Sequence, residues 1–166
     1  MLFQVLTMQT IAIPTYLSHL PIYQGWPVPF TQAWFDGKPD FRTVDPQKTV
    51  RCVTEKLCAI CGRRLGDKSY FIGGPLSKAN RVFTDPPMHK RCAEFAAQTC
   101  PFVSGRKLEY SKRPVNANMA KIQEMVSTQR PTQMFILTAW TKKTRLVRHG
   151  DNIFIWAASW ISRKTI

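Results

Sequence analysis

The sequence predicts an α+β fold: a small zinc-stabilised, treble-clef-like module with an N-terminal hairpin and a C-terminal antiparallel sheet. Two pairs of Cys and His residues at the spacing of metal ligands indicate the zinc module, and a signal for the start of a helix precedes the second pair. Apolar runs bounded by turn residues indicate the strands. The chain has 166 residues, 44% hydrophobic and 20% charged, so it can bury one ordinary core. We expect a single domain over residues 30–166, with the zinc module at about 52–102 and a basic part at 103–166.

Residues 1–29 are predicted to form a proline-rich arm that precedes the domain. Prolines at positions 14, 21, 27 and 29 exclude a long helix and favour extended backbone. The arm lacks the basic residues of a secretory signal peptide, and five cysteines are an odd number for a disulfide scaffold. Both observations favour the cytoplasm. No apolar run reaches the roughly 18 residues of a transmembrane helix, so no membrane partner is expected.

An N-terminal hairpin is predicted over residues 30–44. Residues 30–35 form the first strand and 41–44 the second, joined at Asp36-Gly37 because both residues tolerate positive φ. The next segments are a cysteine knuckle and two short strands around a Gly-Gly-Pro turn, at residues 57–65, 69–73 and 80–84.

A helix is predicted over residues 88–100. Thr84 or Asp85 can cap it, Pro86 fits a first turn in which its missing N–H has no partner, and Pro101 ends it. The remaining predicted elements are a weaker helix at 116–126 and strands at 134–140, 144–148 and 153–160, with a hairpin loop at 149–152.

The strongest chemical signal is the sequence Cys58-Ala-Ile-Cys61-Gly62, followed after 27 residues by His89-Lys-Arg-Cys92. A C-x2-C knuckle directs two thiolates at one point, and Gly62 permits the sharp turn after it. The i, i+3 spacing places His89 and Cys92 on one helical face. Three thiolates and one imidazole form a closed tetrahedral site, so we predict structural Zn²⁺ bound by Cys58, Cys61, His89 and Cys92.

A catalytic metal site is disfavoured by the neighbouring residues. A zinc deaminase needs Glu two residues after its histidine, where this chain has Arg91. An HNH-type nuclease needs further histidines, and only His19 and His149 remain. The sequence also lacks paired carboxylates, a Ser/His/Asp order and a P-loop. We therefore predict a binding protein and not an enzyme.

Several motifs resemble a family of bacterial and phage proteins to which no activity is assigned. The clearest are Cys58-Ala-Ile-Cys61-Gly62, Pro86-Pro87-Met88-His89, Cys92-Ala93 and Cys100-Pro101-Phe102, and the resemblance covers about residues 16–160. It implies a phage or mobile-element protein acting in a bacterial host cell, and it supports the same four zinc ligands.

The net charge of +14 indicates an acidic partner. Residues 1–35 carry no Lys, Arg, Asp or Glu, whereas residues 102–166 hold 12 basic and only 3 acidic side chains. The candidate partner-binding residues are basic clusters in the C-terminal part and beside the zinc ligands: Lys142, Lys143, Arg145 and Arg148, and Arg63, Arg64, Lys90 and Arg91.

These clusters favour nucleic acid as the partner, because Lys and Arg neutralise phosphates. Trp140, Trp156 and Trp160 could stack on bases, although strand aromatics more often belong to the core. The leading hypothesis is a non-catalytic, zinc-stabilised nucleic-acid-binding protein. The alternative is a protein-directed inhibitor or host-takeover factor that binds an acidic surface of a bacterial defence or nucleic-acid-processing complex, which would explain the charge equally well.

Overall fold

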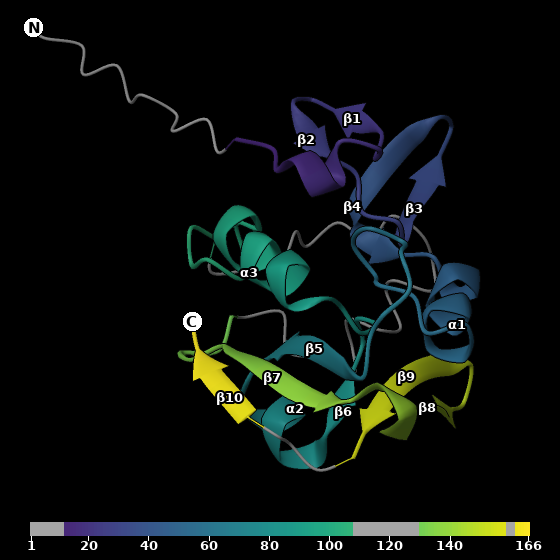
Figure 1. Ribbon diagram of the computed structural model, residues 1–166, viewed down its shortest axis with the longest axis vertical. Coiled ribbons are helices and arrows are strands. Elements are labelled where there is room, and N and C mark those ends of the chain that lie inside the picture. The colour runs from purple at the N-terminus through teal and green to yellow at the C-terminus, as the bar shows by residue number, and fades with distance from the viewer. Residues whose placement is uncertain (1–11, 108–129, 159–161) are drawn as a thin grey trace, which may run out of the picture.

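The computed structural model describes residues 12–107, 130–158 and 162–166 (Figure 1). Within these ranges the helices are short and the sheets antiparallel, which is the mixed helix and strand content predicted. The predicted helix at 116–126 and Trp160 lie outside the described residues. In chain order the elements are η1 (Thr15–Leu17), β1 (Ile22–Tyr23), β2 (Trp26–Pro27), β3 (Gln32–Phe35), β4 (Lys38–Val44), α1 (Pro46–Thr54), β5 (Lys68–Gly73), α2 (Pro75–Asn80), β6 (Val82–Phe83), α3 (Lys90–Thr99), β7 (Phe135–Trp140), η2 (Thr141–Lys143), β8 (Thr144–His149), β9 (Asn152–Ala157) and β10 (Ser162–Thr165).

The predicted N-terminal hairpin forms from β3 and β4. Its turn residues Asp36 and Gly37 have φ values of 48° and 72°, the left-handed conformation that a tight hairpin turn requires. At the open end the register shifts between Gln32 and Ala33, so the strands separate locally.

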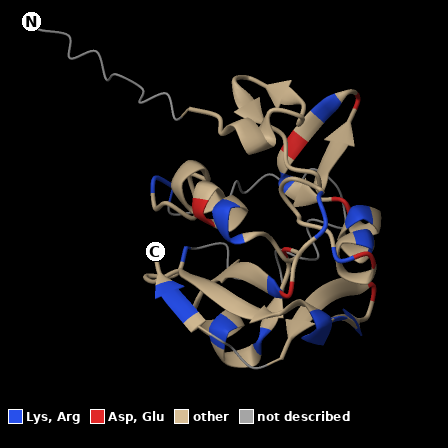
Figure 2. Ribbon diagram, in the orientation of Figure 1, with Lys and Arg blue, Asp and Glu red and all other residues tan. Residues whose placement is uncertain are grey.

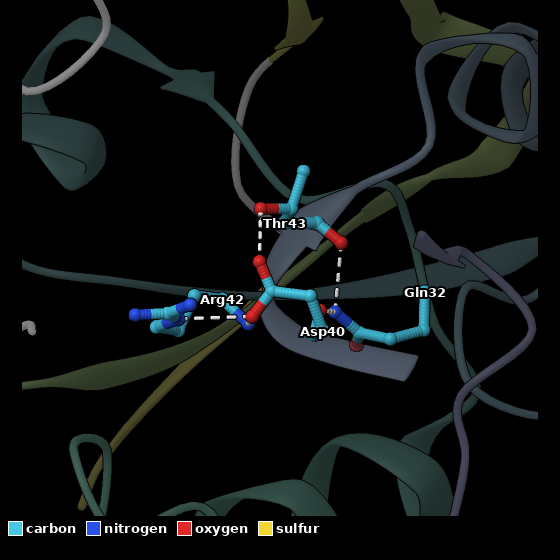
Figure 3. A network of polar contacts seen from close by, with 4 residues as sticks. All are labelled: Gln32, Asp40, Arg42 and Thr43. Atoms are coloured by element: carbon cyan, nitrogen blue, oxygen red, sulfur yellow. Dashed lines mark hydrogen bonds and ion pairs between the residues drawn. The ribbon is translucent and has the colours of Figure 1, made fainter. Parts of the chain in front are cut away.

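A polar network bridges this irregularity (Figure 3). The side-chain amide of Gln32 donates hydrogen bonds to the carbonyl oxygens of Asp40 and Thr43, the latter at 2.7 Å. The carboxylate of Asp40 accepts hydrogen bonds from the Thr43 hydroxyl at 2.6 Å and from the Arg42 guanidinium at 2.9 Å. The two bonds from Gln32 thus satisfy backbone carbonyls next to the register shift, and the bonds to Asp40 hold its carboxylate in place.

Helix α1, which the sequence analysis did not predict, follows the hairpin directly. The carboxylate of Asp45 caps it by accepting hydrogen bonds from the backbone N–H groups of Gln47 and Lys48 at 2.9 and 3.1 Å. Pro46 occupies the first turn, where its missing N–H has no intrahelical partner. The helix buries Cys52 completely, which explains this cysteine as a packing residue.

The C-terminal strands pair in antiparallel fashion, as predicted, but they are divided between two sheets and do not form one sheet of their own. Strand β7 lies between β5 and β10, and the β8–β9 hairpin pairs through β9 with β6. Each three-stranded sheet therefore contains strands from both sides of the predicted boundary at residue 103. Backbone pairing joins the predicted zinc module and the basic part, and β10 is an edge strand that the sequence analysis did not predict.

Helix α3 begins at Lys90, two residues later than predicted, with His89 as its N-cap residue. The predicted cap at residues 84–85 does not form, because Met88 and Tyr70 pair through two backbone hydrogen bonds of 2.9 Å. This pairing keeps the chain extended up to the helix. Between β5 and α3, the predicted turn at 73–75 leads into the short helix α2, and the strand predicted at 80–84 shortens to β6.

Two clusters of buried side chains form the core. One, around Phe71, Leu137 and Ile155, lies where the two three-stranded sheets meet. The other surrounds the Cys/His pairs and includes Leu17 and Leu20. The described part of the predicted arm therefore contributes Leu17 and Leu20 to the core beside the cysteines, while many of its other side chains are exposed. None of the described helices is long and apolar enough to cross a membrane.

Candidate metal centre and basic clefts

The cysteine knuckle lies between α1 and β5. An isolated bridge joins Leu57 to Arg64, and the backbone N–H of Cys58 donates to the carbonyl of Arg63 at 2.8 Å. The N–H of Gly62 donates to the Cys58 carbonyl at 2.9 Å and closes the turn. Gly62 has a φ of +68°, the left-handed conformation predicted from its place after the second cysteine.

The second pair comes from the start of α3, on the other side of the cluster. His89 ends the segment that pairs with β5, and Cys92 lies in the first turn of the helix, fully buried. The backbone N–H of His89 points at the sulfur of Cys58 at 3.4 Å, and its Nδ1 lies 3.3 Å from the sulfur of Cys61. The knuckle and the helix thus bring their ligand atoms to one point.

The four ligand atoms of Cys58, Cys61, His89 and Cys92 all lie within 4.8 Å of one another. A tetrahedral ion with metal–sulfur bonds of about 2.3 Å would separate its sulfurs by about 3.8 Å. The donor set is therefore compatible with a metal site and needs only small movements to close around an ion. Four protein donors would leave a tetrahedral ion no open position for substrate or water.

The electrostatics of the cluster favour a thiolate at Cys58. Hydrogen bonds from the thiols of Cys61 and Cys92 lower the pKa of Cys58 despite its burial, and the backbone N–H of Cys61 adds to this effect. The pKa of Cys92 is raised, because its proton is held by the Cys58 sulfur. Since thiolates and not thiols bind metals, the fold prepares this position for ligation.

Backbone carbonyls orient the imidazoles around the cluster. The Nε2 of His89 lies 3.0 Å from the carbonyl oxygen of Arg64. A proton on Nε2 makes this a hydrogen bond and leaves Nδ1 with a free lone pair directed at the cysteines. His19, from the N-terminal segment, makes a similar contact of 2.8 Å with the carbonyl of Cys61.

The N-terminal segment packs directly on the knuckle. The backbone N–H of Phe30 donates to the carbonyl of Ile60 at 2.8 Å. The Phe30 ring lies so close to Gly62 that a Cβ there would stand 2.9 Å from the ring. On the helix side, the Tyr16 hydroxyl donates to the carbonyl of Arg91 at 3.0 Å, and the Arg91 guanidinium lies 4.2 Å from the Tyr16 ring.

The four basic residues predicted beside the ligands are exposed but face different neighbours. Arg91 covers Tyr16, and the guanidinium of Arg63 lies 3.4 Å from Nδ1 of His19. Arg64 and Lys90 instead line two separate clefts. The structure therefore does not gather these four cations into one patch.

The C-terminal basic residues are likewise exposed and dispersed. Lys142 and Lys143 lie in the 3-10 turn η2, and Arg148 lies near the far end of β8. The guanidinium of Arg145 stands 4.3 Å from the Trp156 ring, and that of Arg81 5.4 Å from it. Trp156 is thus a cation–π partner of two arginines, which occupy the surface that it could offer to a base.

One cleft contains a residue from each of the two predicted clusters, Arg64 and Lys142, and we call it the junction cleft. It has a volume of about 320 Å³ and lies between the end of the knuckle and the β7–η2 connection. The Thr141 hydroxyl donates to the carbonyl of Gly66 at 2.7 Å, and its backbone N–H donates to Asp67 at 2.8 Å, which fixes the two walls. The lining residues are Lys56, Arg64, Leu65, Gly66, Asp67, Trp140, Thr141 and Lys142.

The junction cleft holds three cations, one carboxylate and an aromatic ring that is 37% exposed, that of Trp140. Arg64 and Lys142 were each predicted from local basic runs, but Lys56 was not. The knuckle brings Lys56 beside Arg64, since the N–H of Leu65 donates to the Lys56 carbonyl at 2.7 Å. The pairing of β5 with β7 then brings Lys142 to the same cleft.

Comparisons of the chain with protein-family models, with curated proteins and with solved structures found no match. The resemblance to a bacterial and phage family stays a prediction, and the function has to be argued from the geometry of the site.

Proposed function

We propose that this chain is a non-catalytic, zinc-stabilised protein that binds nucleic acid through the junction cleft. The Cys3His donor set suits Zn²⁺, which prefers sulfur and nitrogen ligands in tetrahedral geometry. The order of knuckle, strand and ligand-bearing helix is that of a treble clef. In this proposal zinc joins the knuckle to α3 and has no part in chemistry. Metal analysis of the purified protein should find one zinc per chain, and a value far below one would contradict it.

The observation that supports nucleic acid is the convergence of Arg64, Lys142 and Trp140 on one cleft. Phosphates release counterions when Lys and Arg neutralise them, and a partly exposed aromatic ring next to these cations can stack on a base. An acidic protein surface would use the cations but gains nothing specific from a concave site beside a planar ring. Stacking makes the combination more typical of nucleic-acid binding.

The experiment is a fluorescence anisotropy titration of labelled DNA and RNA oligonucleotides at several salt concentrations. Binding should weaken steeply with salt, and the log–log slope reports the number of phosphates neutralised. The double variant Arg64→Ser/Lys142→Ser should weaken binding by about tenfold, or about 1.4 kcal/mol. The control Lys38→Ser/Lys107→Ser removes the same charge from exposed positions outside the junction cleft.

Equal losses in the two double variants would show that only net charge matters and would remove the cleft from the proposal. No binding of any oligonucleotide at low salt would contradict nucleic acid as the partner. The hypothesis of a protein-directed inhibitor would then be the one to pursue, by capturing partners from nuclease-treated bacterial lysate.

A further inference from the structure

A second cleft, which we call the sheet cleft, opens between α3 and the sheet of β5, β7 and β10. It has a volume of about 240 Å³. Figure 2 shows basic residues on both α3 and β10, the elements that border it. Four of its lining residues are cations, and the sequence analysis singled out only Lys90 among them: Lys68, Lys90, Arg163 and Lys164.

The positive charge of the sheet cleft is largely uncompensated. Glu94 is its one acidic lining residue among the described part of the chain. The ion pairs found between described residues, Arg42 with Asp40 and Arg51 with Glu55, lie elsewhere. Like charges that line a concave surface reinforce one another's potential and raise the local concentration of anions. The sheet cleft is therefore suited to bind a negatively charged ligand.

Strand register connects the sheet cleft to the junction cleft. Lys68 of β5 pairs directly with Trp140 of β7, and residues directly opposite in an antiparallel pair share one face. Lys68 lines the sheet cleft and Trp140 lines the junction cleft, so the two clefts adjoin at this pair. On the same face, Thr138 pairs with Tyr70 on one side and with Ser162 on the other.

The surface continues to Lys164, which pairs with Ile136 on the same face of the sheet. Trp140 lies four residue steps beyond Ile136 along β7, a distance of about 13 Å at about 3.3 Å per residue. Stacked nucleotides advance about 3.4 Å each in a duplex and further in an extended single strand, so about two to four nucleotides would span this distance. A ligand that contacts both Trp140 and Lys164 must therefore be a short polymer and not a single nucleotide.

We propose that the two clefts form one track for single-stranded nucleic acid, with a base stacked on Trp140 and phosphates held by Lys68, Lys90 and Lys164. This inference rests on the proposed function and specifies its ligand. A duplex encloses its base faces, so Trp140 would have no ring to stack on. A single strand exposes its bases and its phosphates together, which are the two chemistries that this track offers. DNA and RNA share both chemistries, and the assay compares them.

The test measures binding of single-stranded oligonucleotides of about two, four, eight and sixteen nucleotides, in DNA and RNA forms, against a duplex. Affinity should rise steeply between about two and eight nucleotides, because the longer strands reach both clefts. The double variant Arg163→Ser/Lys164→Ser should weaken binding of the eight-nucleotide strand by at least about fivefold. Trp140→Leu should weaken it by about tenfold or more. Both variants should keep the zinc content of the parent protein. The thermal midpoint should be unchanged in Arg163→Ser/Lys164→Ser, whose side chains are exposed, and slightly lower in Trp140→Leu, because Trp140 is only 37% exposed.

The control is again Lys38→Ser/Lys107→Ser, which removes two exposed cations outside both clefts. If Arg163→Ser/Lys164→Ser behaves like this control while Arg64→Ser/Lys142→Ser still weakens binding, the track is wrong and the proposed function survives. Tighter binding of the duplex than of the single strand would also overturn the track. If the parent protein binds no oligonucleotide, the proposed function itself fails, and the two failures are distinguishable.

Discussion

Gly62 provides a sensitive test of the packing between the N-terminal segment and the knuckle. In Gly62→Ala the new Cβ would stand 2.9 Å from Cδ2 and 3.0 Å from Cγ of Phe30, on a backbone with φ of +68°. Both atoms lie near the base of the ring, so rotation of the ring about its own axis does not remove the clash. Phe30 is also anchored by its backbone hydrogen bond to Ile60.

The expected cost has two parts. A left-handed conformation costs a residue with a Cβ about 1–2 kcal/mol. Forcing an extra methyl group into a packed site costs about 1–3 kcal/mol. Gly62→Ala should therefore lower the free energy of unfolding by about 2–5 kcal/mol. Gly37 has a φ of +72° with open space around it, so Gly37→Ala should show only the backbone cost. Gly66 has open space and no positive φ, so Gly66→Ala should leave the free energy of unfolding nearly unchanged.

Urea unfolding of the zinc-loaded protein, followed by tryptophan fluorescence, measures these differences. Phe30→Leu in the Gly62→Ala background should recover part of the loss, because the smaller side chain relieves the contact. Equal destabilisation by Gly62→Ala and Gly37→Ala, within about 0.5 kcal/mol, would refute the packing argument and leave only backbone strain.

Two further predictions concern the metal and the hairpin. Cys58→Ser should lower both zinc content and the free energy of unfolding severely, while Cys100→Ser, eight residues beyond Cys92 and partly buried, should keep one zinc per chain in metal analysis. The pKa of Asp40 is lowered, since hydrogen bonds from Thr43 and Arg42 together outweigh the largest single influence, partial burial, which raises it. Its stabilising contribution is therefore present above the ordinary pKa of about 3.9 and is lost as the pH falls through the lowered value. The difference in urea midpoint between the parent protein and Asp40→Asn should shrink over that acidic range, and a constant difference would contradict the assignment.

The close approach of the predicted ligands could be deduced from sequence because it depends on local spacing. A C-x2-C turn and an i, i+3 pair each bring two ligands together through a few bonds of backbone, and only their mutual approach needs tertiary structure. The hairpin turn at Asp36-Gly37 was predictable for the same reason. The pairing of β5 with β7 was not, because 61 residues separate the two strands and either could have paired with a nearer segment.

The helix starts were predicted incorrectly because the same local sequence signal occurs twice and begins a helix at only one of the two places. Asp45-Pro46 and Asp85-Pro86 both combine a capping residue with a proline, but a helix begins only at the first. A second proline, Pro87, disfavours helical backbone at Pro86, and the pairing of Met88 with Tyr70 then holds the chain extended. The proline pair was visible in the sequence, whereas the strand pairing was not.

Strand β10 was missed because all four of its residues, Ser162–Thr165, are polar and exposed, with no alternation of apolar side chains. Such a strand forms through backbone bonds to β7, and its charged side chains discourage further pairing at the sheet edge. Two of the polar residues that kept β10 from being predicted, Arg163 and Lys164, line the sheet cleft.

The metal centre and the proposed binding surface share backbone. The carbonyl that orients His89 belongs to Arg64, whose side chain lines the junction cleft. The residue after His89 is Lys90, which lines the sheet cleft from the first turn of α3. One wall of each cleft is therefore continuous in backbone with the cluster of Cys58, Cys61, His89 and Cys92. In the proposed function, a closed structural zinc site would couple the two cationic walls to each other through α3 and the knuckle.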